Sequence, residues 1–339
     1  HEVKTLRHVT FPYAKQSLVL VNNITERMLV DWKACKVVWR QSAGIQDHTD
    51  WSPASRATAF VRADNLYVID GEGKVRQITT DGNREITYGV TAYREMFGIY
   101  KGTFWNPDGT RLAFYRMDQT MVRDYPLVDV DPDSMAVLAP EKYPMAGQTT
   151  HEVTVGVYDV KADKTIYLKV GSPKDRYFVN IGWSPDGRTI YLKEFNRKQN
   201  EMSLDAYDAV TGDKRATLYT ERHEKYITSY TSVTFLPWDA DKFILQSQKD
   251  GYNHLYLFNT KGEMLRQLTS GNFVVYDLLG FDKARKRAII LSAESSPIQS
   301  NLYAVDIATG KRTLLDNGRG VHANIISPSG FHDRALSPD

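Results

Sequence analysis

Short runs that alternate between apolar and polar residues recur along the chain, and a glycine follows each within four residues. They occupy residues 65–70, 204–208, 254–258 and 301–306, with text such as N-L-Y-V-I-D and N-L-Y-A-V-D. Alternation with a period of two, closed by a glycine-containing turn, is typical of antiparallel β-hairpins. The i, i+3, i+4, i+7 spacing of apolar residues is almost absent, so we expect little helix.

A second pattern precedes these strands and repeats with them. Full copies begin at Trp51, Trp105 and Trp183, where the text reads W-S-P-A, W-N-P-D-G and W-S-P-D-G. Degraded copies begin at Phe235, Phe281 and Ile326. The steps between starts are 54, 78, 52, 46 and 45 residues. All but one lie near the roughly 40 to 50 residues that one blade of a β-propeller occupies.

These patterns predict the fold. Pro presets φ and Gly tolerates positive φ, so each P-D-G forms a tight turn between two strands. The repeat unit is then a four-stranded antiparallel sheet, which stacks on its neighbours around an axis. We therefore predict an all-β protein, a β-propeller of four-stranded antiparallel blades. The three tryptophans are expected at equivalent buried positions between neighbouring blades.

Composition excludes several classes of protein. The chain has 339 residues, 42% of them hydrophobic, and a formal net charge of +2. Its basic residues are scattered, so no nucleic-acid surface is expected. No apolar run reaches the roughly 18 residues of a membrane span. The single cysteine, Cys35, is interpreted as a small, partly buried strand residue.

Catalytic and metal-binding motifs are absent from the sequence. It contains no G-x-S-x-G, no H-E-x-x-H, no P-loop and no G-x-G-x-x-G. The eight histidines show no metal-ligand spacing, and His254 within a strand is best explained as a structural residue. We therefore assign no catalytic residue, no metal site and no cofactor to this chain.

Function is expected where the repeat is interrupted. The 78-residue step holds an insertion of about 25 to 30 residues that ends near Y-P-M-A-G, residues 143–147. Just before Trp105, residues 93–97 fit no blade strand and are compatible with a short helix. Charged and aromatic interruptions of a regular scaffold are the usual places for a binding site.

The motifs in these interruptions resemble a known family. R-E-M-F-G, F-W-N-P-D-G, L-A-F-Y-R-M-D, Y-P-M-A-G and G-Y-N-H-L-Y-L-F, in this order, are similar to the N-terminal eight-bladed propeller of dipeptidyl peptidase IV. The likeness is to the bacterial branch, including prolyl tripeptidyl aminopeptidases, and runs from about Trp51 to the C-terminus. It implies that residues 1–339 are this propeller, with an incomplete last blade. It also implies a C-terminal α/β-hydrolase domain, absent from this chain, that carries the catalytic serine.

The resemblance also implies a role for the short helix. In the family, glutamates on this helix bind the free α-ammonium of the substrate, so the enzyme measures two or three residues from the N-terminus and cleaves after proline. The matching residue here is Glu95, with Arg94 beside it as a second candidate for binding the substrate N-terminus. Bacterial relatives are expected to have glutamate directly before the phenylalanine, where this chain has Met96.

Two functions of different classes remain open. The first is the substrate-gating propeller of a secreted or periplasmic serine-type peptidase that releases X-Pro dipeptides or tripeptides. Its partners would be peptides with a free N-terminus and proline in the second or third position, its own hydrolase domain and, in a homodimer, a second copy. The alternative is a non-catalytic periplasmic binding propeller of the TolB-like type. The blade repeat does not separate them, whereas the insertion and the R-E-M-F-G segment favour the first.

Overall fold

The computed structural model describes residues 8–13, 15–23, 26–42, 46–131, 135–228, 230–327 and 330–337, and describes side chains throughout these except at positions 8, 94 and 95 and beyond 322. The structure is all-β, as predicted. The one helix of the described chain is a short 3₁₀ helix, η1 (Ala92–Gly98). Residues elsewhere form strands and turns, and every strand pairing inside the named sheets is antiparallel.

In the described part of the chain, six sheets of at least four strands follow one another, and we call them blades 1 to 6. Blade 1 contains β1 (His8–Thr10), β2 (Leu18–Asn22), β3 (Glu26–Asp31) and β4 (Lys36–Ser42). Blade 2 contains β5 (Asp47–Trp51), β6 (Thr58–Arg62), β7 (Asn65–Ile69) and β8 (Val75–Gln77). Blade 3 contains β10 (Thr103–Trp105), β11 (Arg111–Asp118), β16 (Glu152–Asp159) and β17 (Lys164–Tyr167), and β9 (Ile86–Tyr88) pairs with the end of β11.

The remaining blades have the same strand order. Blade 4 contains β18 (Arg176–Trp183), β19 (Thr189–Asn196), β20 (Glu201–Asp208) and β21 (Lys214–Arg222). Blade 5 contains β22 (Thr234–Leu236), β23 (Asp239–Ser247), β24 (His254–Asn259) and β25 (Met264–Gln267). Blade 6 contains β26 (Val275–Asp282), β27 (Arg287–Ser292), β28 (Asn301–Asp306) and β29 (Arg312–Leu314). The last sheet has two strands, β30 (Val321–Ser327) and β31 (Gly330–Ser337), which agrees with the incomplete last blade that the sequence predicted.

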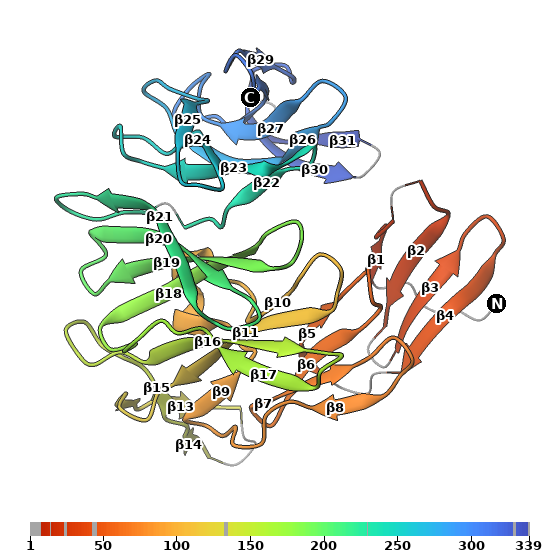
Figure 1. Cartoon of the computed structure of the whole chain (residues 1–339), viewed down its shortest axis with the longest axis vertical. Helices are drawn as coiled ribbons and strands as arrows, with labels where there is room; N and C mark the ends of the chain where they lie inside the picture. The colour runs from red at the N-terminus through yellow and green to blue at the C-terminus, as the bar shows by residue number, and fades with distance from the viewer. Residues whose placement is uncertain are drawn as a thin grey trace.

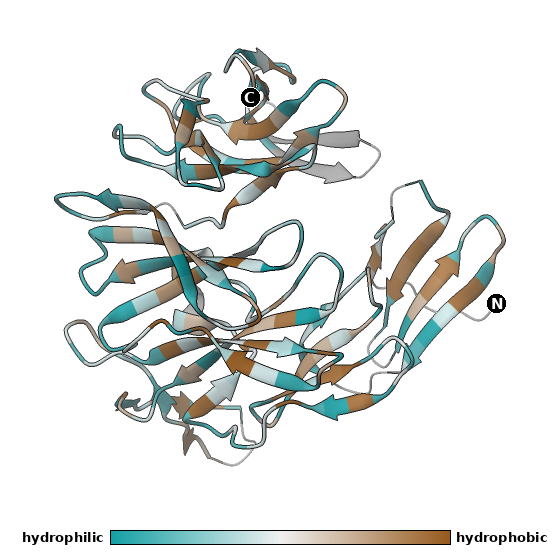
Figure 2. Cartoon of the chain, in the orientation of Figure 1, coloured by the Kyte–Doolittle hydropathy of each residue, from teal (hydrophilic) through white to brown (hydrophobic). Residues whose placement is uncertain are grey.

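The blades are arranged in an arc, with blade 1 at one end and the β30–β31 pair at the other (Figure 1). Hydrophobic residues concentrate on the strands and hydrophilic residues on the turns (Figure 2). The core consists of separate clusters between neighbouring blades. One joins Ala59 of blade 2 to Phe114 of blade 3, and another joins Tyr191 of blade 4 to Phe243 of blade 5. Each blade thus buries its faces only by stacking on the next one, as expected for a repeat protein.

The three tryptophans occupy equivalent positions, as predicted, but they are half-buried where full burial was expected. Trp51, Trp105 and Trp183 each end the first strand of their blade and are half-buried. The indole Nε1 of Trp183 donates to the carbonyl of Phe104 at 2.9 Å, and that of Trp105 donates to the carbonyl of Asp50 at 3.0 Å. In both cases the acceptor is the residue just before the tryptophan of the preceding blade. The ladder stops at Trp51, whose Nε1 is buried without an acceptor among the described residues.

The P-D-G turns also connect one blade to the next. Gly109 and Gly187 have φ of 70° and 65°, which favours glycine. A Cβ on Gly109 would lie 2.5 Å from Oγ of Ser52, and one on Gly187 would lie 2.6 Å from Nδ2 of Asn106. Both neighbours belong to the corresponding turn of the preceding blade. The glycine is therefore needed for the turn itself and for the close approach of two blades.

His254 has the structural role that the sequence indicated. It is fully buried at the start of β24, with Nδ1 3.0 Å from Oγ1 of Thr269 and Nε2 3.0 Å from the carbonyl of Gly271. The same threonine accepts the backbone N–H of Leu255. A buried polar residue at the start of the third strand thus holds the segment that leads to the next blade.

Cys35 corrects a prediction. It is exposed, not partly buried, and it lies in the turn between β3 and β4 with a φ of 51°. The turn forms because Oδ1 of Asp31 accepts the backbone N–H groups of Lys33 and Ala34, at 3.0 and 3.1 Å. Asp often makes such local hydrogen bonds and so ends a strand early.

Two ionisable side chains of blade 4 are buried next to blade 5. Lys193 of β19 is fully buried and Glu221 of β21 is 4% exposed. Oε2 of Glu221 accepts a hydrogen bond of 2.6 Å from the hydroxyl of Ser247 in blade 5. Burial lowers the pKa of Lys193 to about 7, with Glu221 opposing part of the shift. The contact between these two blades therefore includes an ionisable group as well as apolar packing.

Candidate functional site

The short helix η1 forms where the sequence placed a helix-compatible piece. Its backbone is unusual, since φ is positive at Tyr93 (56°), Phe97 (62°) and Gly98 (63°). Positive φ is uncommon for aromatic residues and costs energy, so the surroundings must hold these residues in place. Tyr93 and Phe97 are both 2% exposed, four residues apart, and together they anchor the helix in the core.

An aromatic cluster holds the two anchors. The ring of Phe97 lies 5.0 Å from that of Tyr177, 5.4 Å from Phe195 and 5.1 Å from Tyr230. The ring of Tyr93 lies 5.1 Å from Tyr177. Aromatic pairs at these distances each stabilise by about 0.5–1.5 kcal/mol beyond the area they bury. The segment between β9 and β10 is thereby fastened to blade 4, the next blade along the chain.

Polar contacts fix the same helix. The hydroxyl of Tyr93 accepts the backbone N–H of Phe178 at 3.2 Å, and burial raises the pKa of Tyr93 far above its ordinary value. Nδ2 of Asn180 donates to the carbonyl of Phe97 at 2.9 Å and to that of Tyr230 at 3.1 Å. A buried carbonyl without a hydrogen-bond donor would destabilise the folded state. Because Asn180 donates to both carbonyls, it stabilises the ends of two segments.

The 78-residue step contains an arm, as predicted from the spacing. Between β11 and β16 the chain forms two small antiparallel pairs, β12 (Asp124–Tyr125) with β15 (Glu141–Lys142) and β13 (Val128–Asp129) with β14 (Val137–Leu138). These strands extend from blade 3 at the lower left of Figure 1. The chain then returns to β16 through residues 143–151, which include Y-P-M-A-G.

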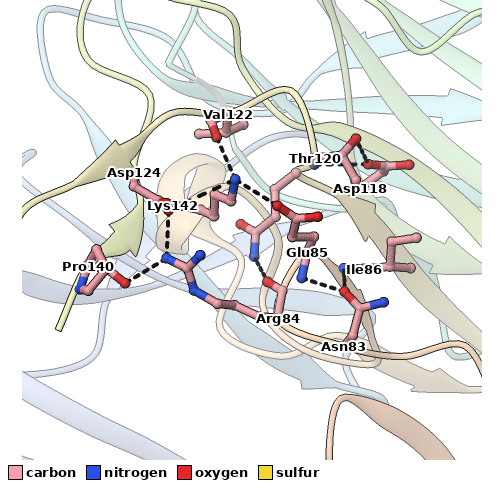
Figure 3. A network of polar contacts seen from close by, with 11 residues as sticks. Asn83, Arg84, Glu85, Ile86, Asp118, Thr120, Val122, Asp124, Pro140 and Lys142 are labelled. Atoms are coloured by element: carbon pink, nitrogen blue, oxygen red, sulfur yellow. Dashed lines mark hydrogen bonds and ion pairs between the residues drawn. The ribbon is translucent and has the colours of Figure 1, made fainter.

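Ion pairs fasten the base of the arm (Figure 3). Arg84, in the loop before β9, donates to Oδ1 of Asp124 at 2.6 Å and to the carbonyl of Pro140 at 2.7 Å. Nζ of Lys142 lies 2.9 Å from Oε1 of Glu85. The Arg84 guanidinium lowers the pKa of Asp124. Both strands of the β12–β15 pair are thus tied to the loop before β9. These contacts fix where the returning segment begins.

Strand direction explains why three distant segments meet. In an antiparallel sheet the loop after strand two and the segment after strand four lie at the same end of the blade. Helix η1 lies in the segment that enters blade 3, and the arm follows its second strand, β11. Residues 197–200 follow β19, the second strand of blade 4. All three are therefore directed to the same face of the propeller.

A pocket of about 450 Å³ lies where these segments meet. It is lined by Tyr93 and Met96 of η1, by residues of the 143–151 segment, and by Tyr177, Arg197 and Gln199 of blade 4. This volume lies within the range of small-ligand sites in proteins. The two interruptions that the sequence analysis selected, the short helix and the Y-P-M-A-G segment, thus form one cavity.

Arg197 is the charged residue of the blade 4 wall. One end of its guanidinium donates to the hydroxyl of Tyr177, and the other donates to the carbonyl of Gln148 at 2.7 Å. Its central carbon also lies 5.7 Å from the centre of the Tyr177 ring. Two hydrogen bonds and a ring contact leave the planar group little freedom, so its orientation is set before any ligand arrives.

Glu95 and Arg94, the predicted binding residues, belong to η1. The structure describes their backbone, and their side chains are outside its described part. Their neighbours Tyr93 and Met96 both line the pocket. Their role therefore stays a prediction. Neither Tyr177 nor Arg197 was predicted from the sequence. Tyr177 lies within an ordinary blade strand and Arg197 in N-R-K-Q-N, which is typical of a hairpin end, and only the strand order brings them near η1.

A second cavity of about 370 Å³ begins where η1 ends. It is lined by Gly98 and Ile99 and by residues of four first strands, including Phe104, Ile181 and Leu278. First strands are the innermost strands of propeller blades, so this cavity lies along the axis of the arc. Helix η1 accordingly contributes residues to both cavities.

Comparison with known proteins decides the family. A family model described as the dipeptidyl peptidase IV (DPP IV) N-terminal region matches residues 16–335. The chain belongs to this family. The resemblance inferred from the motifs is thereby confirmed for almost the entire sequence.

Solved structures and curated relatives agree with this assignment. The structure of a Bacteroides ovatus protein assigned as a dipeptidyl aminopeptidase IV has a TM-score of 0.86 and 37% identity, covering 96% of this chain and 48% of that chain. Porphyromonas gingivalis dipeptidyl peptidase 4 has a TM-score of 0.78 and 25% identity, covering 96% and 46%. An Aspergillus flavus protein assigned as dipeptidyl peptidase 4 is 29% identical over 313 residues, which are 86% of this chain and 40% of that protein.

The chain spans 40% or less of the length of the curated relatives it matches. No helix in the described part of the chain is long and apolar enough to cross a membrane.

Proposed function

We propose that this DPP IV N-terminal region recognises the free N-terminus of peptide substrates for a serine-type peptidase that releases X-Pro dipeptides or tripeptides. The carrying observation is that η1, the segment predicted to bind the N-terminus, has a strained backbone anchored by two buried aromatic residues and borders a 450 Å³ pocket. Strained segments held firmly by their surroundings are characteristic of ligand sites. Catalysis would come from the C-terminal hydrolase domain of the same protein.

In this proposal Glu95 is the anchor for the α-ammonium group. A carboxylate shielded from water pairs strongly with an ammonium group through charge-assisted hydrogen bonds. A blocked, neutral N-terminus would leave that carboxylate desolvated and unpaired, which is costly. The hydrolase would then cut at a fixed distance from the anchor, and Arg94 would orient the carboxylate.

The rest of the proposal follows from the same site. Substrates would carry proline in the second or third position, and the protein would act in the periplasm or after secretion. Dimerisation through a second copy remains an expectation. The alternative, a stand-alone binding propeller of the TolB-like type, gives no role to a pocket built from η1 and the arm.

The decisive experiment replaces Glu95 with Gln in the full-length protein and measures kcat/KM on X-Pro-chromophore substrates. Loss of one member of a buried charge pair costs about 2–5 kcal/mol, so the rate on free N-termini should fall by roughly 30-fold to several-thousand-fold. N-acetylated substrates should be slow with both enzymes. Glu72→Gln, at the exposed turn between β7 and β8, is the matched control. An unchanged preference for free N-termini in Glu95→Gln would exclude Glu95 as the anchor.

A second experiment separates the two parts of the protein. The 339-residue chain alone should release no chromophore, because its sequence has no nucleophile elbow. A serine in this chain that reacts with a fluorophosphonate inhibitor would contradict the assignment. A full-length protein that binds a protein partner but hydrolyses no peptide would support the TolB-like alternative instead.

A further inference from the structure

The pocket beside η1 has two chemically different walls. On the side of the arm and η1, Met96, Pro144, Met145 and Ala146 form an apolar patch, and the lining there also includes Tyr143, Thr150 and His151. On the side of blade 4 it is polar, with Tyr177, Arg197 and Gln199. A ligand that fits both walls needs an apolar body and a group that accepts hydrogen bonds.

The polar wall is rich in donors. Arg197 has five N–H bonds and uses one on Tyr177 and one on Gln148. Because the hydroxyl of Tyr177 accepts from Arg197, its own proton remains to be donated elsewhere. Oε1 of Gln199 accepts from the hydroxyl of Tyr230 at 3.3 Å, which leaves its NH₂ group as a donor. Three donor groups on one wall favour an oxygen-rich, negatively charged ligand.

The charges around Arg197 also favour a negatively charged ligand. Arg197 is half-buried, and the described residues provide it with carbonyl and hydroxyl acceptors but with no carboxylate. Other half-buried arginines of the same blade and its neighbours are paired, for example Arg176 with Glu194 at 2.5 Å and Arg111 with Asp159 at 3.1 Å. A guanidinium that is held in place and lacks a carboxylate is a ready-made site for one.

We propose that this pocket binds the carboxylate of an acidic side chain near the N-terminus of the peptide, with Arg197 as the residue that determines this preference. The inference rests on the proposed function and adds a substrate class to it: peptides whose first residues include glutamate or aspartate. Met96 and Pro144 would contact the methylene groups of that side chain, while Arg197, Tyr177 and Gln199 would donate to its oxygens.

The test uses full-length protein and two matched substrates, Glu-Pro-chromophore and Gln-Pro-chromophore, which differ only in charge. Wild-type kcat/KM should favour the glutamyl substrate by about tenfold to a hundredfold, the range for a hydrogen-bonded charged group. Arg197→Gln should reduce this ratio to about one, and Arg197→Lys should keep part of it. Arg188→Gln, at an exposed turn of blade 4, should leave the ratio unchanged. A higher salt concentration should bring the wild-type ratio of kcat/KM for the two substrates closer to one, because salt screens the charge of Arg197.

A purely structural role for Arg197 gives a different result. Arg197 also ties blade 4 to the 143–151 segment, so its loss could slow both substrates equally. Only the Glu/Gln ratio reports recognition of charge, because folding and positioning defects cancel in it. A ratio of one in the wild-type enzyme, or a ratio that survives Arg197→Gln, would overturn the proposal. Inhibition by glutarate combined with a wild-type ratio of one would also overturn the assignment to a peptide side chain.

Failure of the proposed function can be told apart from failure of this inference. If the full-length protein hydrolyses no X-Pro substrate, the proposed function is wrong. Calorimetric titration with unmodified Glu-Pro-Leu and Gln-Pro-Leu peptides then tests the pocket without turnover. Tighter binding of the glutamyl peptide that disappears in Arg197→Gln supports the inference. Equal binding of the two peptides overturns it.

Discussion

The contact between blades 3 and 4 and the pocket beside η1 are built from neighbouring residues but in opposite ways. Between the blades the sequence repeats, and the indole hydrogen bond that Trp183 makes recurs one blade earlier at Trp105. At the pocket, nothing repeats. Tyr93 has positive φ, the described residues give Arg197 no carboxylate partner, and the arm has no equivalent in the other described blades.

The difference separates stability from recognition. Repeated contacts can lose one member and keep the others, because each blade is supported by two neighbours. The pocket depends on single residues from three segments, so the loss of one changes its shape or charge. Variants matched for burial but placed in one region or the other should therefore have the same effect on stability and different effects on substrate choice.

The largest effect is expected for Phe97→Ala. The side chain is 2% exposed in a cluster of aromatic rings, and removing such a ring costs about 3–5 kcal/mol of unfolding free energy. Phe243→Ala, between blades 4 and 5, should cost about as much. Denaturant titration measures both costs, and kinetics on free and acetylated N-termini should change only for Phe97→Ala. Equal changes in selectivity would remove the distinction between the two regions.

The next effect depends on pH. Burial lowers the pKa of Lys193 to about 7, below its value of about 10.4 in an unfolded chain. Between these values the unfolded state binds a proton that the folded state has released, so stability should rise as pH rises from 7 towards 10. The slope from one such group is at most about 1.4 kcal/mol per pH unit. Denaturant titrations at pH 7, 8 and 9 should show this rise in the wild type and a flatter profile in Lys193→Met.

The same series can refute this account of the contact beside blade 5. A profile equally steep in Lys193→Met would assign the slope to other groups. Substrate preference should remain unchanged in this variant at every pH, since Lys193 lines neither of the two cavities next to η1.

A smaller loss is expected for Trp183→Phe. The substitution keeps an aromatic ring and removes the indole donor to Phe104, which should cost about 1 kcal/mol. Trp32→Phe, at a 52% exposed position in the turn after β3, serves as the control and should change little. Thermal unfolding of both variants measures the difference. If Trp183→Phe loses no more stability than the control, the indole hydrogen bond adds nothing to stability beyond the packing of the ring.

The smallest effect on global stability is expected for Arg84→Ala. Its ion pair with Asp124 is half exposed, and exposed pairs contribute little to folding. The local effect should be clear, because Arg84 holds both ends of the arm. Limited proteolysis should cut within residues 126–139 faster in the variant, at an unchanged melting temperature. Unchanged cleavage would show that the Lys142–Glu85 contact is sufficient to hold the arm.

The blades could be predicted because their rules are local. A tryptophan, a P-D-G turn and an alternating strand each act within about ten residues, and their recurrence fixed six first strands correctly, from Trp51 to the degraded copies. The insertion was visible as an excess of length. Cys35 was misplaced because a local hydrogen-bonding residue, Asp31, ended the strand sooner than the apolar pattern indicated.

The site could be predicted only in part, because its residues come from segments that are far apart in the sequence. Residues 93–97 and 143–147 stood out as interruptions, and the structure places them in one pocket. Arg197 did not stand out, since nothing in its neighbours distinguishes a pocket arginine from one in a hairpin. Its position follows from strand direction in two adjacent blades, a property of the assembled propeller and not of any segment of sequence.

The indole hydrogen bonds of Trp105 and Trp183 give blades 2 to 4 a direction. In both bonds the donor belongs to the later blade and the acceptor to the earlier one, whereas Trp39 of blade 1 donates to the carbonyl of Gly71 in blade 2 at 3.1 Å. A ribosome delivers the chain in the same order, and domains commonly begin to fold from the N-terminal side during synthesis. At these two contacts a newly made blade therefore meets a carbonyl that is already in place. A circular permutant that begins with blade 4, so that blade 3 is made after it, would break this match between synthesis and assembly, even though the finished contacts were the same.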